Sequence, residues 1–250
     1  MGNPLPAIVK VGKQSRFLVD GKPFLILGLQ WACDTCFSKE EMNPLFAHAA
    51  RMGANTAVLP IYWREVEPEP DRLDFSMLDE RLEQCRQNGL RLVLLWFATW
   101  KNAHAFYAPD YIKYQPETYA PALDREGKPL VSLCPSCEAT WQRDRRALVA
   151  MMEHLRQVDE QRTTIMIQLE NEPGIMGSDR CYCAACNAKF AAGDWEARFG
   201  ADAAEAFSVV SIADYIDRLA VEAKAIYPLP MYMNVWLASL GAAPGRNYPS

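Results

Sequence analysis

Along the chain, short apolar runs without a helical period alternate with segments in which apolar residues recur at helical spacing. A nearly continuous apolar run of this length is typical of a buried strand in a parallel sheet, whereas recurrence at helical spacing indicates an amphipathic helix. The pattern therefore predicts a parallel sheet whose strands are joined by helices. The predicted strands are residues 24–30, 56–62, 91–98, 165–172 and 231–237.

Helix boundaries carry their own signals. Ser38, followed three residues later by Glu41, forms a capping box that begins the first helix, and Gly53 ends it. Further helices are expected at residues 76–89, after residue 136, around 184–199 and at 208–226, and a hairpin is expected at residues 7–23.

A strand followed by a helix, repeated along the chain, fits either an open doubly wound sheet or a closed barrel. A doubly wound sheet usually has a glycine-rich turn after its first strand. Here the first strand leads into residues 31–36, Trp-Ala-Cys-Asp-Thr-Cys, and polar or aromatic residues close every strand, as at the catalytic face of a barrel. We therefore predict an α/β fold, a (β/α)8 TIM barrel truncated after about five strand–helix units, with a short N-terminal hairpin.

The composition and net charge limit the kinds of molecule that the chain is expected to bind. Half of the 250 residues are apolar, which suffices for one domain spanning residues 1–250, with a cysteine-rich insertion at about 175–200. The net charge of −5, without long runs of either sign, argues against nucleic acid or an anionic membrane as a partner. No secretory signal or membrane-spanning run is visible, so a cytoplasmic location is expected. A homo-oligomer is left open.

The fourth predicted strand ends in the strongest candidate for chemistry. Its apolar residues give way at once to Glu170, Asn171 and Glu172, and Pro173 and Gly174 stop the strand. Parallel α/β enzymes build active sites at that edge of the sheet, so we favour function over a capping role for Glu172. Because alternate strand residues point the same way, Glu170 is placed to repel the Glu172 carboxylate and favour its protonated form. A structural role for Glu170 is nevertheless preferred to a catalytic one.

Three stretches resemble the family 35 and family 42 β-galactosidases. Residues 19–28, Val-Asp-Gly-Lys-Pro-Phe-Leu-Ile-Leu-Gly, resemble their entry segment. Residues 62–75, in which Trp is followed by Glu-Pro and then Asp-Phe, are similar to their segment after strand two. Residues 168–174, Gln-Leu-Glu-Asn-Glu-Pro-Gly, resemble their Asn-Glu acid/base motif. The chain thus resembles the N-terminal two-thirds of a retaining glycoside hydrolase barrel.

The resemblance implies a retaining glycoside hydrolase in which Glu172 is the general acid/base and Asn171 binds the sugar 2-hydroxyl. It places the nucleophile at the end of a seventh strand, beyond Ser250, and names a β-galactoside or related oligosaccharide as substrate. At 96–102 the chain departs from the Cys-Ala-Glu-Trp-like segment usual in family 35, so galactose is favoured by resemblance alone. Four residues are candidates to line the sugar site, with rim packing as an equal alternative: Trp63, Trp100, Lys101 and Trp236.

The cysteines follow a metal-binding spacing. Cys181, Cys183 and Cys186 form a Cys-x-Cys-x-x-Cys knot, which is poorly suited to internal disulfides but suits a tetrahedral metal ion with a fourth thiolate from elsewhere. By resemblance to family 42, this ion is a structural Zn2+, and Cys134 is the fourth ligand because it carries the shared Cys-Pro pair. Cys137 is the alternative ligand, and free or oxidised thiols are the alternative to a metal.

Two other functions remain open on the sequence. One is a non-catalytic barrel module that binds zinc or sugar. The other is a thiol oxidoreductase using Cys33 and Cys36, because strand, Cys-x-x-Cys and helix is also the thioredoxin arrangement. Nothing else in the sequence supports that fold, and an ordinary pair of loop thiols is the simpler interpretation. Cys85 is expected in the core.

Overall fold

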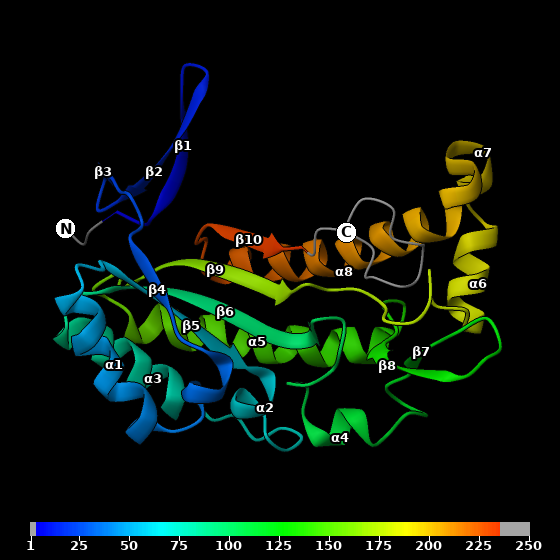
Figure 1. The fold of residues 1–250 in the computed structure, drawn as a ribbon, viewed down its shortest axis with the longest axis horizontal. Helices are drawn as coiled ribbons and strands as arrows, with labels where there is room; N and C mark the ends of the chain where they lie inside the picture. The colour runs from blue at the N-terminus through cyan, green and yellow to red at the C-terminus, as the bar shows by residue number, and fades with distance from the viewer. Residues whose placement is uncertain (1–3, 236–250) are drawn as a thin grey trace.

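The centre of the protein is a five-stranded, all-parallel sheet. The structure is a computed structural model that describes residues 4–235 (Figure 1). The strand order is β10-β9-β6-β5-β4, so chain order runs without interruption from one edge to the other. This is the order of successive strand–helix units in an α/β barrel. The strands are β4 (Gly28–Gln30), β5 (Thr56–Tyr62), β6 (Arg91–Lys101), β9 (Thr164–Asn171) and β10 (Met231–Asn234).

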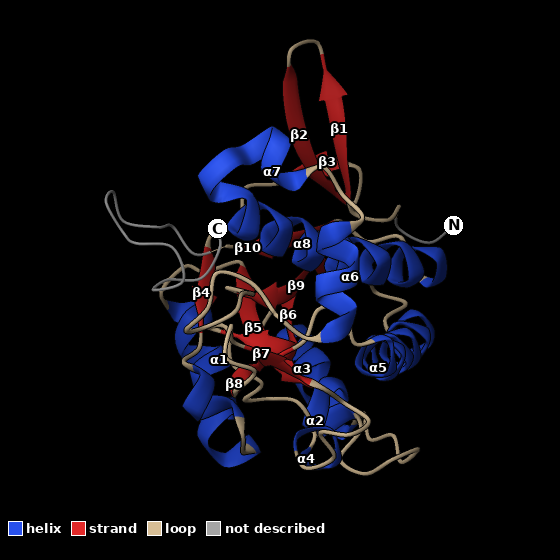
Figure 2. Ribbon diagram, turned by 90° about the vertical axis from the view of Figure 1, so that its right-hand side faces the viewer, coloured by secondary structure: helices blue, strands red, loops and turns tan. Residues whose placement is uncertain are grey.

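Four longer helices connect these strands, and they follow one another around the sheet (Figure 2). α3 packs on β5 and β6, α5 packs on β6, and α8 packs on β9 and α5. Their buried faces are the apolar stripes that the sequence predicts, with Leu148, Met152 and Leu155 fully buried on α5. The helices are α1 (Lys39–Arg51), α3 (Ser76–Gln87), α5 (Glu138–Val158) and α8 (Ala203–Ile226). In the described part of the chain, no helix has the length and apolarity to cross a bilayer.

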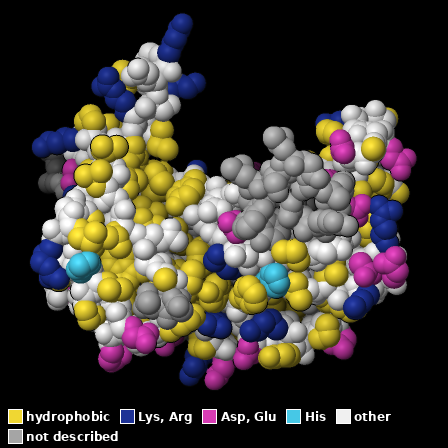
Figure 3. All heavy atoms as spheres, viewed as in Figure 1, with side chains coloured by type: hydrophobic (Ala, Val, Ile, Leu, Met, Phe, Trp, Pro, Cys, Tyr) yellow, Lys and Arg dark blue, Asp and Glu magenta, His cyan; other side chains and the backbone are white. Residues whose placement is uncertain are grey.

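The predicted N-terminal hairpin is confirmed. β1 (Ala7–Val11) pairs antiparallel with β2 (Gln14–Val19), which pairs with β3 (Lys22–Pro23). The hairpin projects from the body of the molecule in Figure 1. Figure 3 shows apolar side chains gathered at its foot.

The prediction of a buried first strand at residues 24–30 was wrong in extent and in burial. Only Gly28–Gln30 forms the strand β4, while Leu25 and Leu27 are 76% and 54% exposed. The reason is position: among the described residues, β4 pairs with β5 alone, so it is an edge strand. β10 forms the opposite edge of the sheet. This strand was predicted at residues 231–237, of which Trp236 and residue 237 lie outside the described part of the chain.

Residues 99–136, between the third predicted strand and the next predicted helix, contain regular structure. β6 continues to Lys101, and the two short strands β7 and β8 pair antiparallel. Short elements of this kind have too few residues to show a period in the sequence. The remaining short elements are α2 (Trp63–Val66), α4 (Asp110–Lys113), β7 (Pro121–Leu123), β8 (Pro129–Leu133), α6 (Ala184–Ala191), α7 (Trp195–Phe199) and the 3₁₀ turns Cys33–Cys36 and Gly200–Asp202.

Candidate functional site

The Asn-Glu pair lies at the carboxyl edge of the parallel sheet, where Asn171 is the last residue of β9 and Glu172 follows it. The backbone of Glu172 is fixed on both sides, because its N–H donates to the Asn234 carbonyl at 3.0 Å and its carbonyl accepts the Ala103 N–H at 2.9 Å. The Asn171 carbonyl likewise accepts the Asn102 N–H at 2.9 Å. Glu172 is half-buried. The end of β9 is therefore held between β10 and the segment that follows β6.

That segment is a tight turn, Lys101 to His104. Lys101 and His104 exchange two backbone hydrogen bonds, of 2.8 and 3.1 Å, across the two central residues. Both central residues have positive φ, 53° at Asn102 and 59° at Ala103, as in a type I′ hairpin turn. The Lys101 ammonium donates to the Asn102 side-chain oxygen and lies 5.4 Å from the centre of the Phe97 ring.

Two neighbouring amides fix the orientation of the Asn171 side chain. Gln168 Nε2 donates to Asn171 Oδ1 at 3.3 Å, and Asn171 Nδ2 donates to Asn102 Oδ1 at 3.1 Å. An Asn amide has two N–H donors, and the contact with Asn102 uses one of them, which leaves the second for a ligand. Asn102 and Gln168 are not among the site residues predicted from the sequence. The turn that carries Asn102 lies about 70 residues before Asn171 in the chain and leaves no local signal in the sequence.

Backbone strain is concentrated at this site. Among the described non-glycine residues, seven have positive φ, and four of these are Asn102, Ala103, Glu170 and Glu172. Such conformations cost about 1–3 kcal/mol each and persist only where surrounding contacts enforce them. Here the enforcing contacts are the hydrogen bonds between the turn and the end of β9. A cluster of strained residues around a carboxylate supports a functional site.

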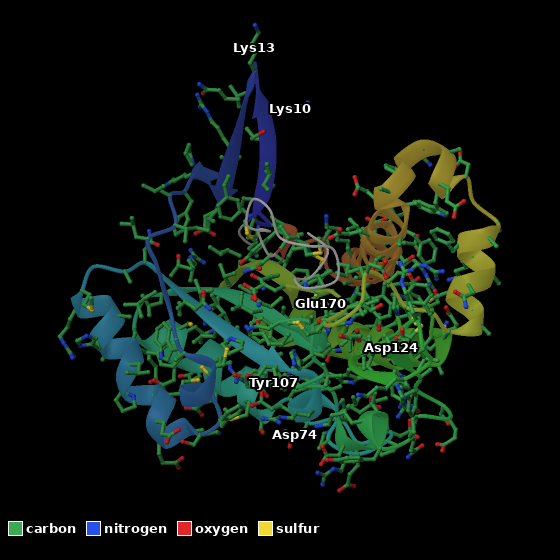
Figure 4. All side chains as sticks on the ribbon, turned by 45° about the vertical axis from the view of Figure 1, so that its right-hand side comes forward. Lys10, Lys13, Asp74, Tyr107, Asp124 and Glu170 are labelled. Carbon is green, nitrogen blue, oxygen red and sulfur yellow. The ribbon has the colours of Figure 1, made fainter. Side chains whose placement is uncertain are left out.

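The strain also overturns the argument that placed Glu170 beside Glu172. Strand alternation requires extended backbone, but φ is 57° at Glu170 and 48° at Glu172. The Glu170 carboxylate instead accepts three backbone N–H groups of β6, from Ala98 at 3.3 Å, Thr99 at 3.0 Å and Trp100 at 2.8 Å. Figure 4 places Glu170 near the middle of the molecule. Its structural role is thus clear from its contacts.

The structure separates the four candidate lining residues. Trp63 and Trp100 are fully buried, and the Trp63 indole donates to Glu67 at 3.3 Å, so packing is the favoured role for both. Lys101 is half-buried in the strained turn. Trp236 lies outside the described residues. Of the four, Lys101 is the strand residue that pairs with Asn171 within the described part of the chain.

A second cluster joins the four predicted cysteine ligands. The sulfur atoms of Cys134, Cys181, Cys183 and Cys186 all lie within 4.8 Å of one another. Cys134 Sγ is 3.6 Å from each of the other three. A tetrahedral Zn2+ with Zn–S bonds of about 2.3 Å places its sulfur atoms about 3.8 Å apart, so the cluster fits such an ion. Four thiolates would fill all four positions around such an ion.

Backbone N–H groups support this cluster. Leu123 and Ser136 donate to Cys181 and Cys134, both at 3.4 Å, and Cys186 donates to Cys183 at 3.4 Å. Hydrogen bonds to sulfur stabilise thiolates, the form in which cysteine binds a metal. The donors come from the start of α6, the end of β7 and the loop after β8. The cluster therefore joins segments that are far apart in the sequence.

The other cysteines lie apart from this cluster. Cys137 Sγ faces the Thr118 carbonyl at 3.5 Å and accepts the Ala120 N–H at 3.4 Å, so the geometry favours Cys134 over Cys137 as the fourth ligand. Cys33 and Cys36 occupy a 3₁₀ turn after β4, where Cys33 is half-buried and Cys36 is buried. Cys85 is in the core as predicted, and burial raises the pKa of its thiol to about 12.

Comparison with known proteins gives a consistent family. A family model described as beta-galactosidase, glycoside hydrolase family 42, matches residues 37–203. The curated Beta-galactosidase BgaA from Thermus sp is 29% identical over 143 residues, which are 55% of this chain and 20% of that protein. The matched family segment contains both the Asn-Glu pair and the four clustered cysteines.

Solved structures share the fold. A beta-galactosidase from the Antarctic haloarchaeon Halorubrum lacusprofundi superimposes with a TM-score of 0.64 at 21% identity, covering 84% of this chain and 36% of that one. A beta-galactosidase from the psychrophilic Marinomonas ef1 gives 0.66 at 15% identity, covering 84% and 37%. The chain thus spans about a third of the length of these solved enzymes and a fifth of the curated relative.

Proposed function

The chain belongs to glycoside hydrolase family 42, the beta-galactosidase family, and on that basis we propose that it carries the acid/base half of a retaining β-galactosidase site. The observation that carries the proposal is the half-buried Glu172 beside the oriented Asn171 at the carboxyl end of β9. The substrate class is a terminal β-galactoside or a related oligosaccharide.

In this reaction Glu172 protonates the glycosidic oxygen as the leaving group departs, and then takes a proton from the water that releases the sugar. The second carboxylate, the nucleophile, comes in this proposal from outside residues 1–250. Retaining enzymes need the two carboxyl groups about 5 Å apart. Held by the Asn234 carbonyl and the Ala103 N–H, the backbone of Glu172 is positioned before substrate arrives.

Asn171 donates its remaining N–H to the sugar 2-hydroxyl, a contact that strengthens in the oxocarbenium-like transition state. Its other N–H and its oxygen are already engaged by Asn102 and Gln168, so the amide cannot turn to present its oxygen without losing both contacts. Lys101, next to Asn102, supplies a positive charge and hydrogen-bond donors beside the sugar. Trp236 retains its proposed place in the lining, outside the described residues.

The cysteine cluster holds a structural Zn2+ in this proposal, with Cys134, Cys181, Cys183 and Cys186 as ligands. All four positions would be taken by thiolates, so the ion supplies cross-linking rather than Lewis-acid chemistry. It fixes the start of α6 to the loop between β8 and α5. That loop leads into α5, and α5 packs on β6. The strand β6 in turn leads into the strained turn at Asn102 and Ala103.

The substrate class is tested in a polypeptide that carries this chain within a complete eight-stranded barrel. Aryl β-galactoside should be hydrolysed with a higher kcat/KM than the matched aryl glucoside and mannoside, with retention of anomeric configuration followed by NMR. Inversion of configuration would contradict the proposed double displacement. Preference for another sugar would leave the acid/base assignment intact and correct the substrate.

Residues 1–250 expressed alone are expected to give no turnover of an aryl β-galactoside above a blank. The reason is that one carboxylate of the pair is insufficient for retaining chemistry, and the described sheet has five strands, whereas eight close a barrel of this kind. Glu172→Ala in the same chain is the control. Turnover by residues 1–250 that disappears in this variant would show that both carboxylates lie within the chain.

A further inference from the structure

Two carboxyl groups meet in the interior beneath the Asn171–Glu172 pair. Glu170 on β9 and Asp144 on α5 are both fully buried. They lie close enough for each carboxyl group to shift the pKa of the other. Among the ion pairs of the described residues, none involves either of these carboxyl groups. A buried carboxylate without a cation is costly, and two adjacent ones are more so.

The hydrogen-bond geometry around Asp144 calls for an additional proton. Asp144 Oδ2 lies 2.7 Å from the Thr99 hydroxyl and 3.1 Å from the Tyr215 hydroxyl, which are themselves 2.8 Å apart. Three contacts among three oxygens need three protons, and the two hydroxyls supply only two. A proton on the Asp144 carboxyl group completes the triangle. Asp144 Oδ1 accepts the Trp96 indole N–H at 2.9 Å.

Glu170, the other member of the pair, binds the backbone of β6. Its oxygens accept three backbone N–H groups, from Ala98, Thr99 and Trp100. These donors lie where the pairing of β6 with β9 is irregular, between Trp96 and Lys101. The carboxylate thus replaces the partner that the strand ladder would have offered. It binds the backbone that leads directly into the strained turn at Asn102.

Burial raises the pKa of both carboxyl groups and so favours a proton on the pair, and the contacts with the two hydroxyls place that proton on Asp144. Burial raises the pKa of Asp144 to about 6, although hydrogen bonds from Thr99, Trp96 and Tyr215 oppose the shift. Burial and then the charge of Asp144 raise the pKa of Glu170 well above its ordinary value, against the three backbone donors. The other titratable group facing them is Tyr215 on α8, and burial raises its pKa well above its usual value, so it stays neutral.

We propose that Glu170 and Asp144 share one proton and act as a positioning pair for Asn171 and Glu172. The neutral partner satisfies the Thr99–Tyr215 triangle, while the charged partner holds the backbone of residues 98–100. Through that backbone the pair sets the turn whose Asn102 orients Asn171 and whose Ala103 binds the Glu172 carbonyl. The catalytic consequence rests on the proposed function, but the shared proton does not.

The sign of the pH dependence follows from the raised pKa values. The pair keeps its proton in the folded chain at pH values where the unfolded chain has lost it, so its stabilising effect is full at acid pH. The effect is lost as pH rises through the upper of the two folded pKa values of the pair, because the lower step still leaves one proton on the pair. Loss of the proton leaves two buried anions and loosens residues 98–104.

The shared proton is tested by infrared spectroscopy on residues 1–250 in D2O. At about pH 6 ordinary carboxylates are ionised, so a remaining carbonyl band of a protonated carboxyl group reports the pair. The band should be present in the wild-type chain, absent in the double variant Asp144→Asn with Glu170→Gln, and unchanged in Glu138→Gln, a control at an exposed position of the same helix as Asp144. A wild-type chain without the band, or a band that survives the double variant, would overturn the proposal.

The positioning role is tested by amide hydrogen exchange at residues 98–104. Glu170→Gln replaces an oxygen acceptor by an N–H donor facing backbone N–H groups, so exchange at Ala98, Thr99 and Trp100 should accelerate. Asp144→Asn keeps a neutral partner in the triangle and should leave these amides protected at every pH, whereas in the wild-type chain protection falls as pH rises. Equal pH dependence in wild type and Asp144→Asn would refute the role, even if Glu170→Gln fails to fold.

In a complete barrel the same pair should affect catalysis through orientation. Asp144→Asn should leave KM for an aryl β-galactoside nearly unchanged and make the alkaline decline in kcat weaker than in the wild-type enzyme, because ionisation of the pair no longer contributes to it. An unchanged pH profile with an intact infrared band would refute the catalytic consequence alone. A barrel that hydrolyses no galactoside would refute the proposed function and leave the infrared and exchange results as they stand.

Discussion

Replacing Glu172 by Gln, in a polypeptide that carries this chain within a complete barrel, is expected to slow hydrolysis of an alkyl β-galactoside by about 100- to 10,000-fold. An alkoxide is a poor leaving group and departs only with the proton that the acid supplies. The amide of Gln fills the same space and keeps the backbone contacts to Asn234 and Ala103, but it cannot transfer that proton. An activated aryl galactoside needs little protonation and should lose far less in its first step.

The matched control is Glu126→Gln, an exposed carboxylate in the turn between β7 and β8, which should leave both rates unchanged. A second readout separates the acid/base from a merely structural residue. In Glu172→Ala, azide should restore turnover of an activated galactoside, because this anion attacks the glycosyl intermediate without a general base. The product should be the galactosyl azide of retained configuration. Equal activity of Glu172→Gln and wild type on the alkyl substrate would refute the assignment.

The inner strands were predicted well from the sequence, because a strand that is buried on both faces is apolar at nearly every position. β5, β6 and β9 all lie where the apolar runs placed them, at residues 56–62, 91–101 and 164–171. The edge strand β4 was predicted less well, because Leu25 and Leu27 are as apolar as core residues although they are exposed in the described structure. Apolarity indicates the face that a chain can bury, and a pairing partner decides whether it is buried.

The candidate site was predictable only in part. Asn171 and Glu172 were found because polarity changes abruptly at the end of an apolar strand. The partners of Asn171 were missed, because the contact with Asn102 spans 69 residues of chain and depends on a turn with two positive-φ residues. The alternation argument for Glu170 failed for a related reason: left-handed backbone at Glu170 and Glu172 breaks the two-residue period. Strain of this kind arises from tertiary contacts and has no local pattern.

The cysteine knot shows the opposite case, in which spacing alone carried most of the prediction. Three cysteines within six residues indicated a shared centre, and the structure brings their sulfur atoms together with Cys134. The choice between Cys134 and Cys137 could not be made from spacing. It follows from the geometry, since Cys137 faces the backbone of residues 118 and 120 instead.

Replacing Cys186 by Ser is expected to abolish metal binding and to destabilise the segment from α6 to α7. Wild-type chain purified under reducing conditions without added metal should contain about one Zn2+ per chain. The Cys186→Ser chain should contain far less. Zinc bound by four cysteines can contribute about 10–16 kcal/mol of apparent binding free energy in small zinc domains, and part of that becomes folding free energy. Loss of the ion also leaves buried thiols or thiolates in close contact.

The matched control is Cys137→Ser, which removes a cysteine on the same loop without touching the cluster. It should keep the metal and a melting temperature close to that of the wild type. In Cys186→Ser, and in wild type treated with a chelator, limited proteolysis should cut first within residues 175–200. The inner strands β6 and β9 are buried apart from the cluster, so hydrogen exchange there should change less. A metal content near zero in freshly reduced wild type, or equal losses in Cys137→Ser and Cys186→Ser, would contradict a structural zinc site.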